Sequence, residues 1–336
     1  MSRTSKIALA CILALGAAGS SIVNLGGAVA QQTQPEVRMA RDLVAAASAF
    51  ETYTRTASRI DAGFRSPKDV AGAVEVAASH EPHQLETGMI AYAAMAALQD
   101  PRFVGGVQRI VADGRMREVM IRRLRENPES AIELPGAEEA AGRARQALLR
   151  QVEPLLADGR RVKQAAYDIQ HQSWSKVMVG DPRERLALVK QLALRPFAPG
   201  DADAERLYQA LTAHAEAGPG AAPSPVVARG LALAALALAG EANEENGEAL
   251  RSLVSEPRTA SCMHMAKLNL FQCMAVAGPH YEDVFCISQH AMLETGQCMA
   301  SAAGAEAPPT PASREMQTAQ ARSLLIPVAG PARGER

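Results

Sequence analysis

Residues 262–298 read CMHMAKLNLFQCMAVAGPHYEDVFCISQHAMLETGQC. The stretch holds four cysteines at symmetrical distances from Gly278-Pro279, namely Cys262, Cys273, Cys286 and Cys298. Glycine commonly ends a helix, and proline cannot continue one. We therefore expect an antiparallel helical hairpin, with helices over 260–277 and 281–300, that is stapled by disulfides.

Helix geometry limits how these cysteines can pair. At the usual rise per residue, the two cysteines of the first helix lie about 16 Å apart, and those of the second about 18 Å apart. The Cα atoms of a disulfide lie within about 7 Å of each other. Pairing across the hairpin remains, either nested or crossed. The nested bonds, Cys273–Cys286 and Cys262–Cys298, join matching axial levels, and we predict that arrangement.

The helix angles fit the nested bonds imperfectly. Cys262 and Cys273 share a helix face to within about 20°, whereas Cys286 and Cys298 lie about 120° apart. A twist or a frayed end is needed to bring Cys298 to its partner. We expect its bond to be the more easily reduced of the two, because geometric strain raises the reduction potential.

The same cysteines, with His264, His280 and His290 nearby, could instead bind a metal or form a redox-active pair. Structural zinc sites use closely spaced pairs such as Cys-x2-Cys, and no such pair and no Cys-x-x-Cys-His occurs in the chain. The spacing therefore favours structural disulfides and no cofactor. Disulfides are typical of oxidising compartments.

The first thirty residues predict export. Arg3 and Lys6 precede an apolar run over 7–18, and the small residues Ala28-Val29-Ala30 match a cleavage site. We expect a signal peptide over 1–30, and its removal leaves an even number of cysteines, as a disulfide framework requires.

The mature chain would then begin at Gln31, with a lipid anchor on Cys11 or a retained, uncleaved anchor as the alternatives. We expect no transmembrane segment after cleavage, because the most apolar remaining stretch, 231–239, is about half of the roughly 20 residues that a bilayer requires. Heavy use of Ala and Arg suggests a bacterial genome rich in G and C. The predicted location is the periplasm or the cell exterior.

Charge argues against nucleic acid as a partner. Loss of Arg3 and Lys6 changes the net charge from −1 to −3. The basic residues of 115–125 are interleaved with glutamates, and aromatic residues are only 4% of the chain, so neither a basic face nor a stacking platform is indicated.

Several local sequence signals predict where helices begin. A good N-cap residue precedes proline at five places: Ser66-Pro67, Asp100-Pro101, Asn127-Pro128, Asp181-Pro182 and Ser224-Pro225. Apolar residues recur at helical spacing between them. We predict helices near 36–62, 67–79, 82–98, 101–112, 115–126, 137–157, 160–178, 182–194, 202–216, 225–239, 244–254, 260–277 and 281–300.

This pattern predicts an all-α fold, an irregular multi-helix array or bundle. A degenerate helical repeat is the alternative, because the first two cap-proline starts are 34 residues apart, although the next interval is 27. We expect Pro154 to kink or end its helix. The predicted organisation comprises an N-terminal helical domain over 31–217, a Gly/Pro connector over 218–224, a C-terminal helical subdomain over 225–301 and a tail over 302–336.

His80, His83 and Glu86 resemble a metal cluster at first sight. The zincin motif needs two histidines four residues apart on one helix, whereas these are three apart across Pro82. A turn from one helix into the next explains them better, and we predict no metal here.

Asp168, His171 and Ser175 would share one face of the predicted helix 160–178. They are the residue types of a catalytic triad, but known triads bring these residues from different elements. We interpret them as an exposed polar face that caps buried Tyr167, Ile169 and Trp174.

No phosphate-binding, dinucleotide-binding or nucleophile motif is present. We therefore expect an exported, non-catalytic helical protein that binds another envelope component, a protein or a polymer. The alternatives are a periplasmic hydrolase with dispersed active-site residues and a carrier of a small ligand or metal.

Overall fold

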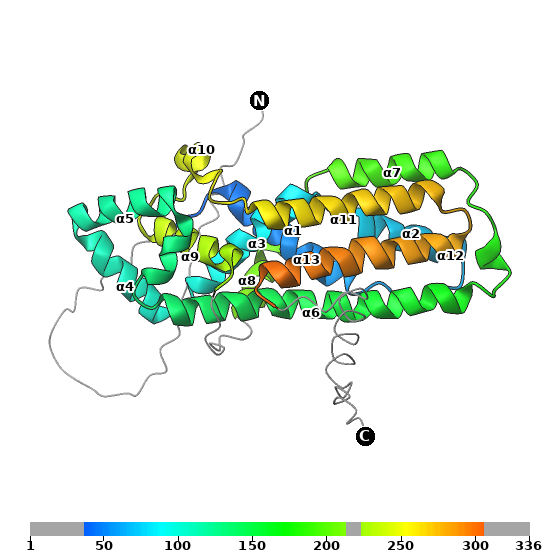
Figure 1. Ribbon diagram of the computed structural model, residues 1–336, viewed down its shortest axis with the longest axis horizontal. Coiled ribbons are helices and arrows are strands. Elements are labelled where there is room, and N and C mark those ends of the chain that lie inside the picture. The colour runs from blue at the N-terminus through cyan, green and yellow to red at the C-terminus, as the bar shows by residue number, and fades with distance from the viewer. Residues whose placement is uncertain (1–36, 213–222, 306–336) are drawn as a thin grey trace, which may run out of the picture.

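The computed structural model describes residues 37–212 and 223–305, and within these ranges it confirms the predicted all-α fold, with helices and no strand. The predicted signal peptide, residues 218–222 of the connector and residues 306–336 of the tail lie outside the described ranges. The helices pack as an elongated bundle (Figure 1).

The α-helices are α1 (Arg41–Ala57), α2 (Pro67–Ala78), α3 (Pro82–Ala97), α4 (Pro101–Ala112), α5 (Gly114–Glu126), α6 (Ala137–Ile169), α7 (Pro182–Leu194), α8 (Asp201–Thr212), α9 (Pro225–Leu238), α10 (Gly247–Leu250), α11 (Pro257–Val276), α12 (His280–Cys286) and α13 (Thr295–Ala302). Short 3-10 helices are η1 (Pro128–Glu133), η2 (Trp174–Lys176) and η3 (Glu244–Asn246), and η4 (Ile287–Glu294) is a π-helix.

Side-chain caps begin many of these helices. Four of the five predicted caps accept hydrogen bonds from the first turn of an α-helix: Ser66, Asp100, Asp181 and Ser224. Asn127 starts only the short η1 and makes no cap bond. Glu81 and Glu256 cap α3 and α11 in the same way. Because glutamate is not a preferred N-cap residue, the sequence prediction placed the start of α11 three residues too late.

Helices α3 and α9 form the centre of the core, since both are buried on nearly all sides. Glycine allows close packing here: a Cβ at Gly88 of α3 would overlap the carbonyl oxygen of Ala46 in α1, and one at Gly230 of α9 would lie 2.6 Å from Cβ of Ala93. Residues from both predicted segments, 31–217 and 225–301, contribute to one hydrophobic cluster.

Helix α6 is continuous, where we predicted two helices over 137–157 and 160–178. Pro154 lies inside it and is exposed, so water can replace the hydrogen bond that the proline removes. The buried apolar face continues on both sides, at Val152, Leu155 and Val162, and this packing holds the helix together. At about 1.5 Å per residue α6 is about 50 Å long, and it runs along most of the bundle (Figure 1).

Two other predicted helices are shorter in the structure. The helix expected over 36–62 is α1 alone, which ends at Ala57 with Ser58 as its C-cap. The helix expected over 244–254 is divided between η3 and α10, with Gly247 at the junction. Glycine lowers helix stability at such a position.

The predicted hairpin is confirmed, and a π-helix solves its geometric difficulty. A π-helical turn bonds residue i to i+5 and so takes up about one more residue than an α-helical turn. Cys298 follows Cys286 by 12 positions, whereas Cys273 follows Cys262 by 11. Absorbing one residue in η4 reduces the angular offset of Cys298 from about 120° to about 20°. Of the two expected causes, a twist or a frayed end, the structure has a change of helical twist in η4, since α12, η4 and α13 form one continuous helical arm.

Deleting Gln289 from η4 should leave both disulfides intact, because the shortened segment can span Cys286 to Cys298 as a regular α-helix. Deleting Asn269 from α11 should instead turn Cys262 by about 100° relative to the rest of the helix. Thiol titration of the two unfolded, unreduced proteins measures the difference. We expect no free thiol in the protein that lacks Gln289 and two in the protein that lacks Asn269. Two free thiols in the protein that lacks Gln289 would contradict the conclusion that η4 aligns Cys298 with Cys262.

Candidate binding surface at the end of the hairpin

The turn of the hairpin lies at one end of the bundle, where it meets the end of α6 and the segment that leads from α6 to α7 (Figure 1). The N–H of Val179 donates to the carbonyl of Gly278 at 2.9 Å, and Met178 forms an isolated antiparallel bridge with Pro279. The structure has the nested disulfides, with Cα–Cα distances of 5.6 Å for Cys273–Cys286 and 5.7 Å for Cys262–Cys298. The first of these ties α11 to α12 directly behind the turn.

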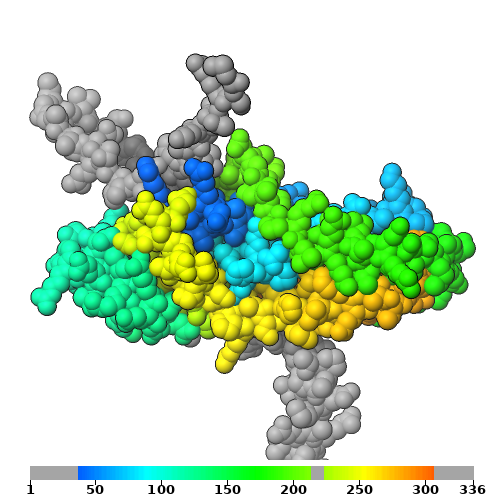
Figure 2. All heavy atoms as spheres, turned by 90° about the horizontal axis from the view of Figure 1, so that it is seen from above, coloured from blue at the N-terminus to red at the C-terminus, as the bar shows by residue number. Residues whose placement is uncertain are grey.

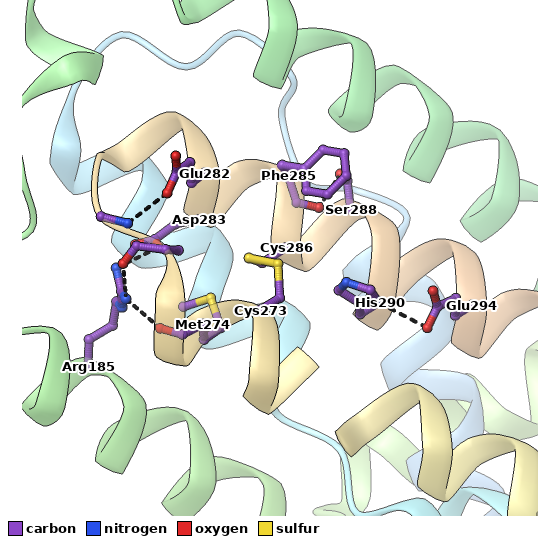
Figure 3. Close-up of a disulfide and its surroundings, with 12 residues drawn as sticks. Arg185, Cys273, Met274, Glu282, Asp283, Phe285, Cys286, Ser288, His290 and Glu294 are labelled. Atoms are coloured by element: carbon purple, nitrogen blue, oxygen red, sulfur yellow. Dashed lines mark hydrogen bonds and ion pairs between the residues drawn. A yellow bond between two sulfur atoms is a disulfide. The ribbon is translucent and has the colours of Figure 1, made fainter. Parts of the chain in front are cut away.

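Arg185 of α7 clamps this turn. Its Nη1 donates to Oδ1 of Asp283 at 2.7 Å, and its Nη2 donates to the carbonyls of Met274 at 2.5 Å and Ala277 at 2.8 Å. The two carbonyls belong to the end of α11, where no intrahelical donor is left to bond them. Both side chains of the ion pair are nearly buried, at 8% and 4% exposure. Figure 3 shows Arg185 pointing to the turn beside the Cys273–Cys286 disulfide.

Burial shapes the electrostatics of the turn. It raises the pKa of Asp283 to about 6, against the opposing effect of Arg185. Burial, with the Arg185 guanidinium as a second cause, lowers the pKa of His280 below its usual value. Glu282 accepts a hydrogen bond from the N–H of Gly278 at 2.7 Å and so stabilises the reversal of the chain.

A polar network holds η4 to its neighbours. Glu294 accepts hydrogen bonds from Asn269 of α11 at 2.9 Å and from Gln289 at 3.1 Å, and His290 lies 3.0 Å from it. Burial raises the pKa of Glu294, but His290, Asn269 and Gln289 together outweigh burial and leave it below its usual value. Lys163 of α6 donates to Gln289 at 2.7 Å, so the π-helix is bonded to both adjacent helices.

A cavity of about 420 Å³ opens between α6 and the hairpin. Its lining includes the aromatic side chains of Tyr167, Tyr281 and Phe285 and the disulfide Cys273–Cys286. The rings of Tyr167 and Phe285 meet edge to face with centroids 6.2 Å apart. The walls are thus mostly apolar and fixed by covalent and aromatic contacts.

Large apolar side chains are exposed at this cavity and at the adjoining turn of the hairpin. We call the exposed set the hairpin-end patch; its members are Tyr167 (46% exposed), Val177 (56%), Met178 (63%) and Val276 (84%). Tyr167 and Val276 also line the cavity. The Met178 side chain covers Gly278, where a Cβ would lie 2.5 Å from its methyl carbon. Tyr167 is therefore exposed, although we expected it to be buried.

The structure does not place Asp168, His171 and Ser175 on one helix face. Helix α6 ends at Ile169, and Ser175 lies in η2. Ser175 is fully buried and donates to the carbonyls of Ile169 and Gln172. Asp168 accepts a hydrogen bond from Gln164 at 2.9 Å. Within the described residues, Ser175 thus closes the end of α6 and makes no hydrogen bond with the exposed His171.

Alanine at Ser175 should lower the free energy of unfolding by about 1–2 kcal/mol, because the buried hydroxyl that bonds the carbonyls of Ile169 and Gln172 is lost. Alanine at the exposed His171 should change it by less than about 0.5 kcal/mol. Urea denaturation measures both. Complete loss of function in a well-folded Ser175→Ala protein would favour the hydrolase alternative instead.

The structure brings His83 and Glu86 together but separates His80 from them. His80 is buried, with Nδ1 3.1 Å from the carbonyl of Ala77. Exposed His83 lies 3.3 Å from Glu86, whose other oxygen accepts from the hydroxyl of Ser255. Across residues 37–212 and 223–305, no three His, Cys, Asp or Glu side chains are arranged to hold a metal ion. No helix in those ranges has the length and apolarity to cross a membrane.

Comparison of the chain with protein-family models, with curated proteins and with solved structures finds no match. Sequence reasoning missed both the Arg185 clamp and the hairpin-end patch. Arg185 lies 98 positions from Asp283, and nothing in the local sequence distinguishes it from the exposed arginines. The pair Val177-Met178 after a helix end was the one local signal of the patch, since apolar residues in a loop suggest a contact.

Proposed function

We propose that this protein is an exported, non-catalytic helical protein that binds another cell-envelope component through the hairpin-end patch and the adjoining cavity. The observation that supports this proposal is the exposure of Tyr167 and Val276 at a preformed, mostly apolar cavity, and of Val177 and Met178 at the adjoining hairpin turn. Export is supported by the N-terminal sequence and by the two disulfides.

The patch has the features of a protein-binding site. Contiguous exposed apolar side chains are uncommon on soluble proteins outside interaction sites. Binding energy concentrates where an apolar or aromatic anchor fills a well-packed pocket, and the cavity between Tyr167 and Phe285 has the size and lining for one such anchor. We infer a protein partner that inserts an aliphatic or aromatic side chain there.

Rigidity supports the same conclusion. The disulfide Cys273–Cys286, the Arg185 clamp and the bridge between Met178 and Pro279 hold the surface in one conformation. A preorganised surface loses less conformational entropy on binding and so binds more tightly for the same contacts. The hairpin is thus suited to present a binding surface.

A photo-crosslinking amino acid at position 276, in protein expressed in its native host, tests the proposal. We expect a crosslinked product with a second protein, because Val276 is 84% exposed beside the cavity. The matched control is position 116: Met116 is 53% exposed on α5, which lies at the other end of the bundle (Figure 1). Equal crosslinking at both positions, or a product of twice the mass of the chain, would contradict the proposal.

The double variant Met178→Glu, Val276→Glu provides a second arm. Both side chains are exposed, so the unfolding midpoint should stay unchanged. Two buried carboxylates at an apolar interface should weaken binding at least about tenfold. Unchanged crosslinking from position 167 in this variant would show that the patch does not bind the partner.

A further inference from the structure

A second cavity, of about 360 Å³, lies beside the connection between α2 and α3. Its walls come from α1, the end of α2, the start of α3, the end of α7 and Phe197. Gln84 fixes one wall, because its amide donates to the carbonyl of Phe197 at 2.8 Å and accepts from the N–H of Phe197 at 2.7 Å. Figure 2 shows α7 lying beside α11 along the molecule. This cavity shares no lining residue with the cavity at the hairpin end.

The floor of the cavity holds a buried histidine with a free nitrogen. His80 is 4% exposed, and its ring centroid lies 4.4 Å from that of Tyr53, with the rings tilted at 46°; Tyr53 also lines the cavity. Nδ1 of His80 contacts the carbonyl of Ala77 at 3.1 Å. Within the described chain Nε2 makes no hydrogen bond, yet it is not one of the fully enclosed unpaired atoms. Because His80 is one of the residues that line the cavity, its unpaired Nε2 is available to a ligand there.

Lys267 of α11 lies behind this histidine. It is 4% exposed, donates to the carbonyl of Ala78 at 3.1 Å and lies 3.2 Å from Nδ1 of His80. Burial lowers its pKa to about 7. Burial and the adjacent Lys267 lower the pKa of His80 well below its usual value, so the imidazole is neutral. When Nδ1 carries the proton and donates a hydrogen bond to the carbonyl of Ala77, Nε2 is a hydrogen-bond acceptor.

The rest of the lining combines apolar walls with an acidic mouth. Leu85, Leu192 and Phe197 supply apolar surface, and Glu75 and Glu81 are the charged residues of the lining. Glu81 accepts the N–H groups of the first turn of α3. Neither glutamate forms an ion pair with another side chain in the described residues, but both oxygens of Glu81 are bonded to backbone N–H groups and its charge also raises the pKa of Lys267. The free negative charge of the lining therefore comes mainly from Glu75.

We propose that this cavity binds a small organic cation, an ammonium group attached to an apolar or aromatic body. The carboxylates of Glu75 and Glu81 attract the cation, and Nε2 of His80 accepts one of its N–H groups. The faces of Tyr53 and Phe197 supply the aromatic surface that ammonium groups favour. This inference goes beyond the proposed function and concerns a separate site.

The probe is 2-phenylethylammonium, and the matched ligands are neutral 2-phenylethanol and anionic 3-phenylpropanoate. For a ligand of this size we expect a dissociation constant on the order of 0.1–1 mM. The two matched ligands should bind at least about tenfold more weakly. NMR titration of the full chain, followed at the His80 imidazole, measures affinity and location together.

Variants separate the cavity from non-specific binding. Glu75→Gln should weaken the ammonium probe about fivefold, and Glu75→Gln with Glu81→Gln should weaken it further. The control Glu138→Gln replaces an exposed glutamate on α6 and should change nothing. Equal binding of the alcohol and the ammonium probe, no change at His80, or equal effects of the Glu75 and Glu138 variants would each overturn the proposal.

Protonation of Lys267 should weaken binding of the cationic ligand. The titratable groups that face His80 are Tyr53 of α1, Glu75 of α2, Glu81 at the start of α3 and Lys267 of α11; Leu192 and Phe197 complete the lining without charge. The hydroxyl of Tyr53 is turned away and donates to Ala291. Below pH 7 the Lys267 ammonium repels the ligand. It also donates a hydrogen bond to Nδ1 of His80, so the ring proton lies on Nε2, and Nε2 becomes a donor.

The affinity for the ammonium probe should therefore fall several-fold from pH 8.5 to pH 6, and the variant Lys267→Met should abolish that fall. An equal fall in both proteins would overturn this role of Lys267.

Discussion

Replacing Arg185 with methionine should lower the free energy of unfolding by about 3–5 kcal/mol at pH 7.5. The substitution removes one partner of a buried ion pair and leaves the Asp283 carboxylate without its cation. It also leaves the carbonyls of Met274 and Ala277 at the end of α11 without their donor. Methionine is similar in length and apolar, so packing is largely retained. Urea denaturation of both proteins measures the loss.

The loss should be smaller at pH 5. Burial raises the folded pKa of Asp283 to about 6, above its ordinary value of 3.8. A raised folded pKa means that the stability from this group is present below the unfolded pKa and is lost as pH rises through the folded pKa. Without Arg185 the folded pKa of Asp283 rises further, so at pH 5 the orphaned carboxyl is protonated and its burial costs less.

Two controls make the Arg185 result specific. Arg102→Met breaks an exposed pair with Glu139, with side chains 77% and 38% exposed, and should change stability by less than about 1 kcal/mol. The double variant Arg185→Met, Asp283→Asn should recover part of the loss, because the buried charge is gone. An equal loss at pH 7.5 and pH 5 would show that the unpaired carboxylate is not its cause.

Removing the Cys262–Cys298 disulfide with two serines should lower the free energy of unfolding by about 4 kcal/mol, and removing Cys273–Cys286 by about 3 kcal/mol. The chain-entropy account sets this order, because the first bond has a sequence separation of 36 and the second of 13. Thermal and urea denaturation of the two variants measure it. The reverse order would show that local packing behind the turn outweighs loop closure.

Partial reduction should open Cys262–Cys298 first. We expected this order from strain, but η4 removes the angular offset on which that reasoning rested. Access is the remaining reason: Cys262 is exposed, whereas Cys286 is 1% exposed and Cys273 is partly buried. Thiol–disulfide exchange requires an attacking thiolate to reach a sulfur atom. Peptide mapping after brief treatment with dithiothreitol should find labelled Cys262 and Cys298; labelled Cys273 would contradict the order.

Local signals in the sequence were sufficient for the helical fold and for the hairpin. The cap-proline pairs at Ser66, Asp100, Asp181 and Ser224 set helix starts, because capping depends on residues within one turn of each other. The spacing of the cysteines about Gly278-Pro279 predicted the stapled hairpin, because rise and turn per residue limit which cysteines can meet. Each of these interactions spans a short stretch of chain or a covalent constraint.

Only the tertiary structure decided the features on which the candidate sites depend. Pro154 lies within a continuous helix because long-range packing outweighs the local cost of proline. The π-helix η4 depends on how α12 and α13 pack on α6 and α11. Burial of Arg185 and Lys267, and exposure of Val276, depend on which distant segments cover each position. Charge and hydrophobicity are properties of a residue, but whether water reaches the residue is a property of the fold. For that reason the sequence alone did not show that Arg185 is buried in the hairpin clamp or that Val276 is exposed on the candidate binding surface.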